Sequence, residues 1–403
     1  MRLLSLMGNQ VASCPQLLSP ESGSPKGAGL VAGAPCNLGA IASQHRSDVA
    51  VDSTGIEMAH AQLDKCYLHI GLWKTGTTRI QSALFDNRQS LAAAGYVYPA
   101  SSANHTFLVS AFHQDAPNWL LNRMAGRTTT SSLQQYHSEQ LAGFEAELCG
   151  APAGTLLLSS EHLLGLNDAA LMNLRRYLER FVRQIEIVCY VRHPVSHAVS
   201  AAQEAIKAGQ QTLQEVLSRP QLYVHLQYEL GRMVEIFGKG NIVLRDYDRI
   251  RGRKGDVLHD FLDVAGLDEN LLIQPSGLRA NESLSMEAAL VASALTEQFP
   301  LLDPGRFAND YLARIPGQTF SLPRWWTDNV ADLAKQDLRY LREVFGVDLV
   351  SPGRLPCADD APRLWGPSTI KALARELNRL AAMVNAAQTK VAELSAQLDK
   401  FGK

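Results

Sequence analysis

The chain has 403 residues, enough for one large α/β domain with appendages or for two or three smaller domains. Hydrophobic residues make up 46% and charged residues 19%, a composition that excludes a fibrous repeat and a chain disordered throughout. The formal net charge of -2 argues against a surface that neutralises a nucleic-acid backbone. Any bound anion must therefore be held by a local site.

The cysteines form neither a disulfide framework nor a zinc site. No two stand in a CxxC pair or near histidines at zinc-ligand spacing; they are Cys14, Cys36, Cys66, Cys149, Cys189 and Cys357. No stretch reaches the run of about 18 apolar residues that a membrane span needs. We therefore expect a reduced, cytoplasmic protein without a metal or a membrane span.

The first 62 residues differ in composition from the rest. Gly, Ser, Pro and Ala dominate, and residues 19–25 hold neither a helical nor a strand period, which predicts disorder. The opening apolar run is interrupted at Gly8 and is too short for an export signal. Met58 stands eight residues before the first strand-like run, which raises the hypothesis that it is the true start.

A proline-rich linker over residues 351–368 and a helix over 369–403 are predicted at the C-terminal end. Apolar residues there follow the alternating steps of three and four of a coiled-coil seam: Ile370, Leu373, Leu377, Leu380, Val384, Ala387, Val391, Leu394 and Leu398. We expect a homo-oligomer through this tail, and a globular domain that stays stable when the chain is cut before Ile370. The alternative is an amphipathic helix packed on its own domain.

Residues 63–350 alternate short apolar runs with helical patterns. The runs lie at 66–70, 155–158, 185–191 and 242–244, and the helical patterns at 77–94, 168–183, 195–207 and 256–265. Strands that alternate with helices predict an α/β domain with an open, doubly wound parallel sheet and helices on both faces. Ligands of such sheets bind outside the carboxyl ends of the strands.

The first predicted strand runs into Gly71-Leu72-Trp73-Lys74-Thr75-Gly76-Thr77-Thr78 and then into a helix. Small residues before a helix N-terminus let backbone N–H groups converge on an anion, and Lys74, Thr77 and Thr78 add a charge and hydroxyl donors. The loop predicts a phosphate site. It differs from the nucleoside-triphosphate P-loop, because Lys74 precedes Gly76 instead of following it.

A second basic segment, Arg192-His193-Pro194, follows the third predicted strand, and Ser200 lies eight residues after Arg192. The Arg192 guanidinium suits bidentate phosphate binding, Pro194 starts the next helix, and the Ser200 hydroxyl can donate from it. The spacing is weak evidence alone and gains weight from its position at a strand end.

Together the two segments resemble the motifs of sulfotransferases that use 3'-phosphoadenosine 5'-phosphosulfate, over about residues 66–287. The resemblance is closest to bacterial sulfotransferase-domain proteins, whose His-Ile-Gly and Ile-Gln correspond to residues 69–71 and 80–81. It implies the P-loop-like sulfotransferase fold, with the 5'-phosphosulfate on Lys74, Thr75, Gly76, Thr77 and Thr78 and the 3'-phosphate on Arg192 and Ser200. Trp73 stands where many members have Pro.

Two later segments also resemble parts of that family. Residues 253–255 read Arg-Lys-Gly, like a motif that follows a helix in that family. Here these residues precede the helix pattern instead, so we interpret them as unrelated to the family motif. The stretch 279–285 resembles an Asn-x-Ser-Leu-Ser element and offers Arg279 and Ser283 as ligands of the nucleotide. Its alternative is a helix N-cap at Ser285.

A general base is expected near the same strand ends. Glu161 follows the strand at 155–158, and bacterial members with Ser-Ser-Glu here favour it as the base. His105 is the rival, because neutral imidazole is a competent base near pH 7. His69 is expected to pack within its strand, and His193 is not needed to explain the motif at Arg192.

We therefore predict sulfuryl transfer to a hydroxyl acceptor, a carbohydrate or a small metabolite, with Lys74 neutralising charge on the leaving phosphate. The segment at about 101–150 is expected to set acceptor choice. The alternatives are a P-loop kinase, which the order of Lys74 and Gly76 disfavours, and a non-catalytic protein that works through its coiled coil.

Overall fold

The computed structural model describes residues 62–151, 154–252, 256–272, 283–299, 305, 308, 311–315, 317–349 and 367–401. These residues belong to one compact unit. Several features predicted from the sequence lie outside the described residues. They are the disorder before Gln62, Met58 as the start, the linker at 351–366, residues 253–255 and Arg279.

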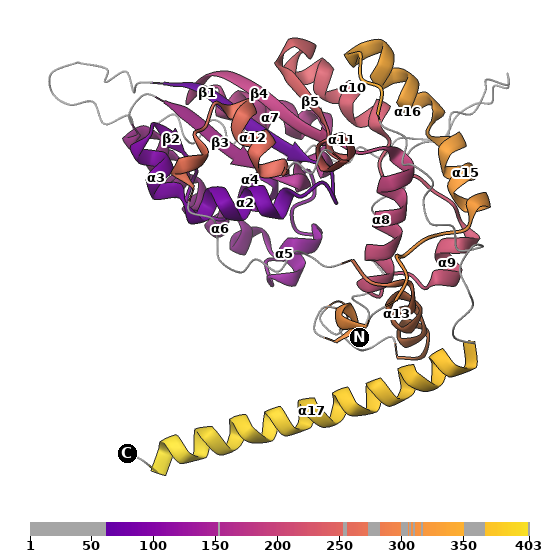
Figure 1. Cartoon of the computed structure of the whole chain (residues 1–403). Coiled ribbons are helices and arrows are strands. Elements are labelled where there is room, and N and C mark those ends of the chain that lie inside the picture. The colour runs from indigo at the N-terminus through magenta and orange to yellow at the C-terminus, as the bar shows by residue number, and fades with distance from the viewer. Residues whose placement is uncertain are drawn as a thin grey trace, which may run out of the picture. The chain divides into compact units, whose positions relative to one another are not determined.

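The strands of the described chain form one parallel sheet with helices packed against it (Figure 1). Its strands are β1 (Leu63–Gly71), β2 (Tyr96–Val97), β3 (Thr155–Ser159), β4 (Val182–Val191) and β5 (Ile242–Asp246), in the order β2-β3-β1-β4-β5. Every pairing is parallel, which confirms the predicted open α/β sheet. β1 pairs with β3 on one side and β4 on the other, so the carboxyl ends of these three strands are neighbours.

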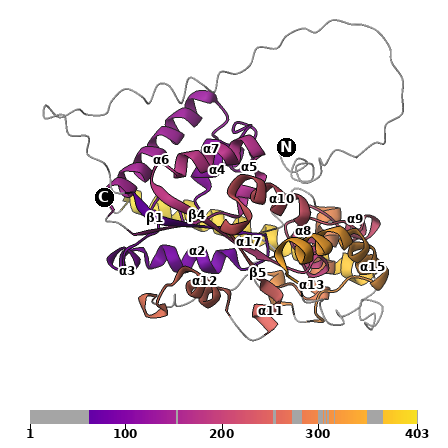
Figure 2. The same ribbon diagram turned by 90° about the horizontal axis from the view of Figure 1, so that it is seen from above.

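Helices cover both faces of the sheet because successive strand residues point to opposite sides. Leu68 of β1 packs into a core beneath α4 (Thr106–Phe112), α6 (Thr130–Gly150), α7 (Asp168–Leu178) and α10 (Leu226–Phe237). Val188 and Tyr190 of β4 pack on the other face with Ile80 and Phe261, which belong to α2 (Thr77–Asp86) and α12 (Val257–Ala265). Figure 2 shows α2, α3 (Arg88–Ala93) and α12 on one side of the sheet and α6, α7 and α10 on the other.

The remaining elements connect and extend these layers. The α-helices are α5 (Leu120–Met124), α8 (Pro194–Lys207), α9 (Leu213–Ser218), α11 (Tyr247–Gly252), α13 (Met286–Gln298), α15 (Arg324–Leu333), α16 (Lys335–Tyr340) and α17 (Pro367–Phe401). Short 3₁₀ segments are η1 (Glu161–Gly165), η2 (Lys239–Asn241), η3 (Glu269–Leu271) and η4 (Leu312–Arg314), and η5 (Leu341–Phe345) is a π-helix. No helix of the described residues is long and apolar enough to cross a membrane.

Two of the predicted helices differ from the structure at their ends. The helix expected over 77–94 is broken at Asn87, whose side chain donates to the Ala83 carbonyl at 2.8 Å and whose backbone leaves the helical region. The helix expected over 168–183 ends at Leu178, because Val182 already pairs with Leu63 in the sheet. The two-residue strand β2 was not predicted, since so short a run has no detectable period.

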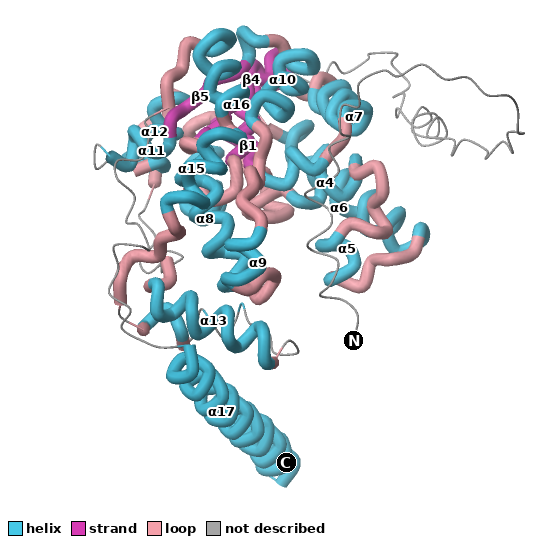
Figure 3. Tube along the Cα trace, turned by 90° about the vertical axis from the view of Figure 1, so that its right-hand side faces the viewer, coloured by secondary structure: helices cyan, strands magenta, loops and turns pink. Residues whose placement is uncertain are grey.

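A second core lies away from the sheet and includes the start of α17. Ile370, Ala374 and Ala381 of α17 are buried against α13, which in turn packs on α8. Figures 1 and 3 show α17 beside α13 only near its first turns. From residue 382 to 395 every side chain is exposed, including Val391 at 65% and Leu394 at 47%. The first half of the predicted seam is thus part of this core.

We expect the position of a C-terminal truncation to decide its effect on stability. Ending the chain before Pro367 exposes the apolar residues of α13 that α17 covers. We therefore expect it to lower the free energy of unfolding by about 2 to 4 kcal/mol. This outcome differs from the stable product expected from the sequence, because Ile370 and Ala374 belong to the core.

Ending the chain after Ala381 removes turns whose described side chains, residues 382–395, are all exposed within the chain, and should leave the stability of the globular domain unchanged. Urea unfolding of both truncations and the full chain measures the difference. Equal stability of both truncations would contradict the packing role of the first turns.

Candidate functional site

The loop between β1 and α2 is held in a fixed conformation. Lys74 and Gly76 have left-handed backbones, with φ of 69° and 80°. The buried Thr75 hydroxyl donates to the Leu72 carbonyl at 2.6 Å, and His197 Nε2–H of α8 donates to the Trp73 carbonyl at 3.1 Å. Contacts from within the loop and from α8 therefore fix its path.

The N-terminus of α2 is suited to an anion. Gly76 is its N-cap, so no side chain caps the first N–H groups, and the first turn contains no acidic residue. Uncapped N–H groups and the positive end of the helix dipole favour a bound negative charge. Thr77 is buried and Thr78 is exposed at this end.

Two glycines make this close approach possible. A Cβ on Gly71 would overlap Thr77 Cγ2 and lie 3.3 Å from His69 Nε2. A Cβ on Gly76 would lie 2.8 Å from Val257 Cγ1, and its positive φ is strained for other residues. The loop can fold against α2 and α12 only with glycine at both positions.

Lys74 is paired with an acidic residue that the sequence analysis did not single out. Its Nζ lies 3.0 Å from Glu204 Oε2 of α8. His197, Ser200 and Glu204 are spaced by three and four residues, so they share the α8 face that meets this loop. A helical spacing count from Ser200 could have identified Glu204 and His197.

Arg192 follows β4 and is held by the first turn of α11, which comes directly after β5. Its Nε donates to Asp248 Oδ1 at 2.9 Å, and Asp248 Oδ2 accepts the His193 N–H at 3.2 Å. The guanidinium also lies 5.6 Å from the centroid of the Tyr247 ring. A guanidinium has five N–H donors, so its terminal nitrogens can still serve an anion.

Glu161 begins the 3₁₀ turn after β3 and contacts the start of α2. Its Oε2 accepts a short hydrogen bond from the Thr77 hydroxyl, and its Oε1 lies 3.9 Å from His162 Nε2. Burial lowers the pKa of His162, and the Glu161 carboxylate opposes that shift. The contact brings the candidate base to the first residue of α2.

His105 and His69 are buried beside the end of β3. His105 is 1% exposed, and its Nδ1 accepts the Ser159 N–H at 3.1 Å. Burial lowers the pKa of His105 to about 4 and that of His69 to about 3. His69 Nδ1 bonds the Ser159 hydroxyl at 2.8 Å, so both rings support the end of β3.

The remaining predicted residues are more peripheral. Ser283 is exposed just before α13, and the N-cap of that helix is Ser285, whose hydroxyl accepts the Ala288 N–H at 3.0 Å. No contact between described residues joins Ser283 to Lys74 or Arg192. His193 caps α8, because its Nδ1 accepts the Val195 N–H at 3.3 Å.

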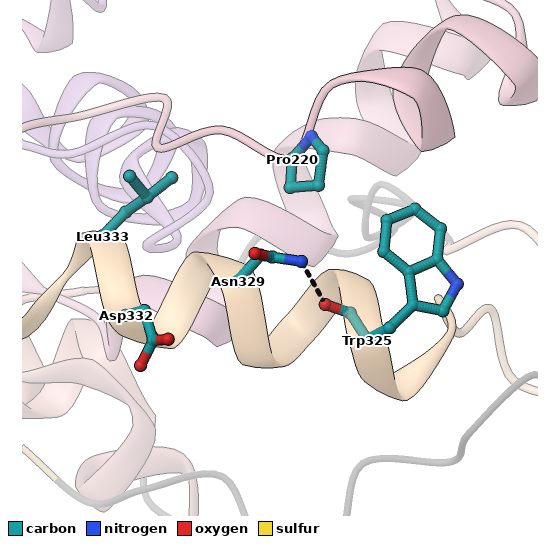
Figure 4. A pocket seen from close by; sticks show the side chains of 5 residues that line it. All are labelled: Pro220, Trp325, Asn329, Asp332 and Leu333. Carbon is teal, nitrogen blue, oxygen red and sulfur yellow. Dashed lines mark hydrogen bonds between the residues drawn. The ribbon is translucent and has the colours of Figure 1, made fainter.

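A surface hollow in the described structure lies elsewhere. Figure 4 shows it between Pro220 and the α15 residues Trp325, Asn329, Asp332 and Leu333, with Asn329 Nδ2 donating to the Trp325 carbonyl at 2.8 Å. It contains none of the predicted site residues. No group of three or more His, Cys, Asp or Glu in the described ranges could hold a metal ion.

We expect Gly71→Ala to disrupt the loop, because the added methyl overlaps Thr77 Cγ2. Overpacking of this kind costs about 1 to 3 kcal/mol. Gly143→Ala is the control, since Gly143 is exposed in α6 with open space around it, and it should stabilise by about 0.5 to 1 kcal/mol. Thermal unfolding measures both changes, and a neutral Gly71→Ala would argue against the close approach.

Comparison with known proteins gives limited similarity in sequence. No family model matches the chain. An uncharacterised protein of Archaeoglobus fulgidus is 28% identical over 152 residues, which cover 38% of this chain and 41% of that protein. The chain thus spans about two fifths of the length of the curated relative that it matches.

Several solved structures are similar over most of the chain. A sulfotransferase from Alicyclobacillus acidocaldarius covers 72% of this chain and 98% of its own, at 13% identity and a TM-score of 0.37. The sulfotransferase domain of the Synechococcus PCC 7002 olefin synthase gives the same coverage of both chains, at 15% identity and a TM-score of 0.35. Retinol dehydratase in complex with androsterone and the inactive cofactor PAP covers 72% of this chain and 82% of its own, at 14% identity and a TM-score of 0.29. At these low scores the similarity carries no functional argument.

Proposed function

We propose that this chain is a sulfotransferase that moves a sulfuryl group from 3'-phosphoadenosine 5'-phosphosulfate to a hydroxyl acceptor. One observation carries the proposal. The neighbouring strands β1, β4 and β3 are followed by two cations and a carboxylate, which are Lys74, Arg192 and Glu161. Glu161 also contacts Thr77 at the uncapped start of α2. Two phosphate-binding positions and a base are what this transfer needs at one sheet edge.

The residues fit the donor. The N–H groups at the start of α2, with Lys74, Gly76, Thr77 and Thr78, would hold the 5'-phosphosulfate. Thr75 and Thr77 would contribute through their backbone N–H groups, because their hydroxyls already donate to the Leu72 carbonyl and to Glu161. Arg192 and Ser200 would hold the 3'-phosphate, and the donor supplies the sulfuryl group and a phosphate leaving group.

Glu161 is the better candidate for the base. It is about a quarter exposed, whereas His105 is buried and its Nδ1 already accepts a backbone N–H. Glu161 would take the acceptor proton, Thr77 would orient the carboxylate, and Lys74 would offset charge on the leaving phosphate. His113 stacks on Trp119, and Trp119 meets His162, so the segment at 101–150 reaches the neighbour of Glu161. This supports a role of that segment in binding a carbohydrate or a small metabolite.

We expect Arg192→Ala to remove the preference for a 3'-phosphate. Loss of charge-assisted hydrogen bonds should weaken binding of adenosine 3',5'-bisphosphate by about 10- to 100-fold and leave adenosine 5'-phosphate nearly unchanged. Calorimetry of the full chain measures both affinities. Arg183→Ala is the control, because Arg183 lies at the opposite end of β4 and pairs with Asp64 at 3.0 Å.

The same titration separates the alternatives. A preference of the unmodified chain for ATP would support the P-loop kinase and overturn the sulfotransferase. No nucleotide binding at all would favour a non-catalytic protein that works through α17. Unchanged 3'-phosphate discrimination in Arg192→Ala would mean that Arg192 is misassigned.

We expect Glu161→Gln to separate binding from chemistry. The amide keeps the size of the side chain but cannot take a proton, so nucleotide affinity should persist while transfer falls by about 100- to 10,000-fold. Sulfate transfer is measured with an acceptor found by screening carbohydrates and small alcohols. If His105→Gln folds normally and gives the larger fall, the base assignment reverses.

We also propose that the distal half of α17 joins two copies of the chain. Val384 and Val391 at one seam position and Leu380 and Leu394 at the other form the pattern that favours two-stranded coiled coils, and all four are exposed. The truncation after Ala381 should then be a monomer by light scattering while the full chain is a dimer. An unchanged mass would exclude this part of α17 as the oligomerisation element.

A further inference from the structure

Both proposed phosphate-binding cations are paired with a carboxylate of the same chain, but the two pairs differ. Asp248 is 19% exposed and makes two contacts, with Arg192 Nε and the His193 N–H. Glu204 is 45% exposed, and its side chain meets Lys74 alone among the described residues. Asp248 therefore positions Arg192, whereas another anion could replace Glu204 as the partner of Lys74.

The Glu204 carboxylate lies beside the loop through its contact with Lys74. His197, on the same α8 face, donates to the Trp73 carbonyl, so this face of α8 lies directly against the loop. The left-handed backbone of Lys74 fixes where its side chain leaves the loop, and that side chain is 27% exposed. A phosphate at the start of α2 and the Glu204 carboxylate would compete for the same ammonium and repel each other.

We propose that Glu204 is a resident counter-ion of the phosphate loop. It holds Lys74 when no nucleotide is bound and yields it when a nucleotide phosphate takes its place. This inference rests on the proposed function, because it needs a nucleotide phosphate at the start of α2. Glu204 then lowers affinity for donor and product nucleotide alike, which favours product release, and it keeps Lys74 in position between turnovers.

The test is the affinity of the full chain for adenosine 3',5'-bisphosphate, measured by calorimetry. Glu204→Gln removes the competing charge and should tighten binding by about 3- to 10-fold at low salt, with a smaller gain at high salt. Glu186→Gln is the matched control, because Glu186 forms a Lys–Glu pair of similar length, 2.9 Å, with Lys65 in the middle of the sheet. It should leave the affinity unchanged.

A double-mutant cycle tests whether the effect passes through Lys74. In a Lys74→Ala background there is no ammonium to exchange, so Glu204→Gln should give a clearly smaller gain. An equal gain in both backgrounds would mean that Glu204 repels the nucleotide without holding Lys74, and would overturn the exchange. Glu204→Asp keeps the charge, but its side chain is too short for the contact with Lys74, so the gain in nucleotide affinity should be intermediate. This variant replaces Glu204→Gln in the test if Glu204→Gln does not fold.

The outcomes separate this inference from the function on which it rests. If the unmodified chain binds the bisphosphate and Glu204→Gln binds it equally or more weakly, the counter-ion role is wrong and the sulfotransferase stands. If the unmodified chain and both Glu204 variants fail to bind, the proposed function is wrong and this inference falls with it.

Discussion

The close approach of β1 to the start of α2 is the constraint on which the site depends. Thr77 fills the space beside Gly71, so no side chain separates the last residue of β1 from the first residue of α2 in space. Gly76 at the N-cap leaves the first N–H groups of α2 without a side-chain cap, and the Thr77 hydroxyl at this turn donates to Glu161. The carboxyl ends of β1, β3 and β4 are neighbours in the sheet, so the other site residues follow from the strand order.

The sequence predicted the sheet because its strands are apolar runs followed by helical patterns. β1, β3, β4 and β5 were found this way, whereas β2 is too short to show a period. Helix ends were less predictable, since the break at Asn87 depends on a side-chain hydrogen bond and the start of β4 depends on pairing with β1. Local pattern thus predicts which elements exist, and tertiary contacts set where they end.

The candidate site could be predicted in part for the same reason. Lys74, Arg192 and Glu161 follow strands, so the rule that ligands bind at carboxyl ends indicated them, and the resemblance to members with Ser-Ser-Glu favoured Glu161 as the base. Asp248 and Glu204 were missed because their roles arise only when β5 packs beside β4 and α8 packs on the loop. The sequence therefore indicated Lys74 and Arg192, whereas their carboxylate partners could be identified only from the folded structure.

These carboxylates determine the charge that an incoming anion meets. Three histidines around these strand ends are buried, and burial lowers the pKa of His69 to about 3 and those of His105 and His197 to about 4. They stay neutral through the whole range in which an exposed imidazole would gain a proton, so they add no positive charge near neutral pH. In the proposed site, Lys74 and Arg192 are then the cations that would meet the ligand, and each is paired with a carboxylate. An anion therefore gains full use of Lys74 only by displacing Glu204, whereas Arg192 can keep Asp248 and still offer its terminal nitrogens. The loop after β1 is in this sense the adjustable half of the site, and the end of β4 is the fixed half.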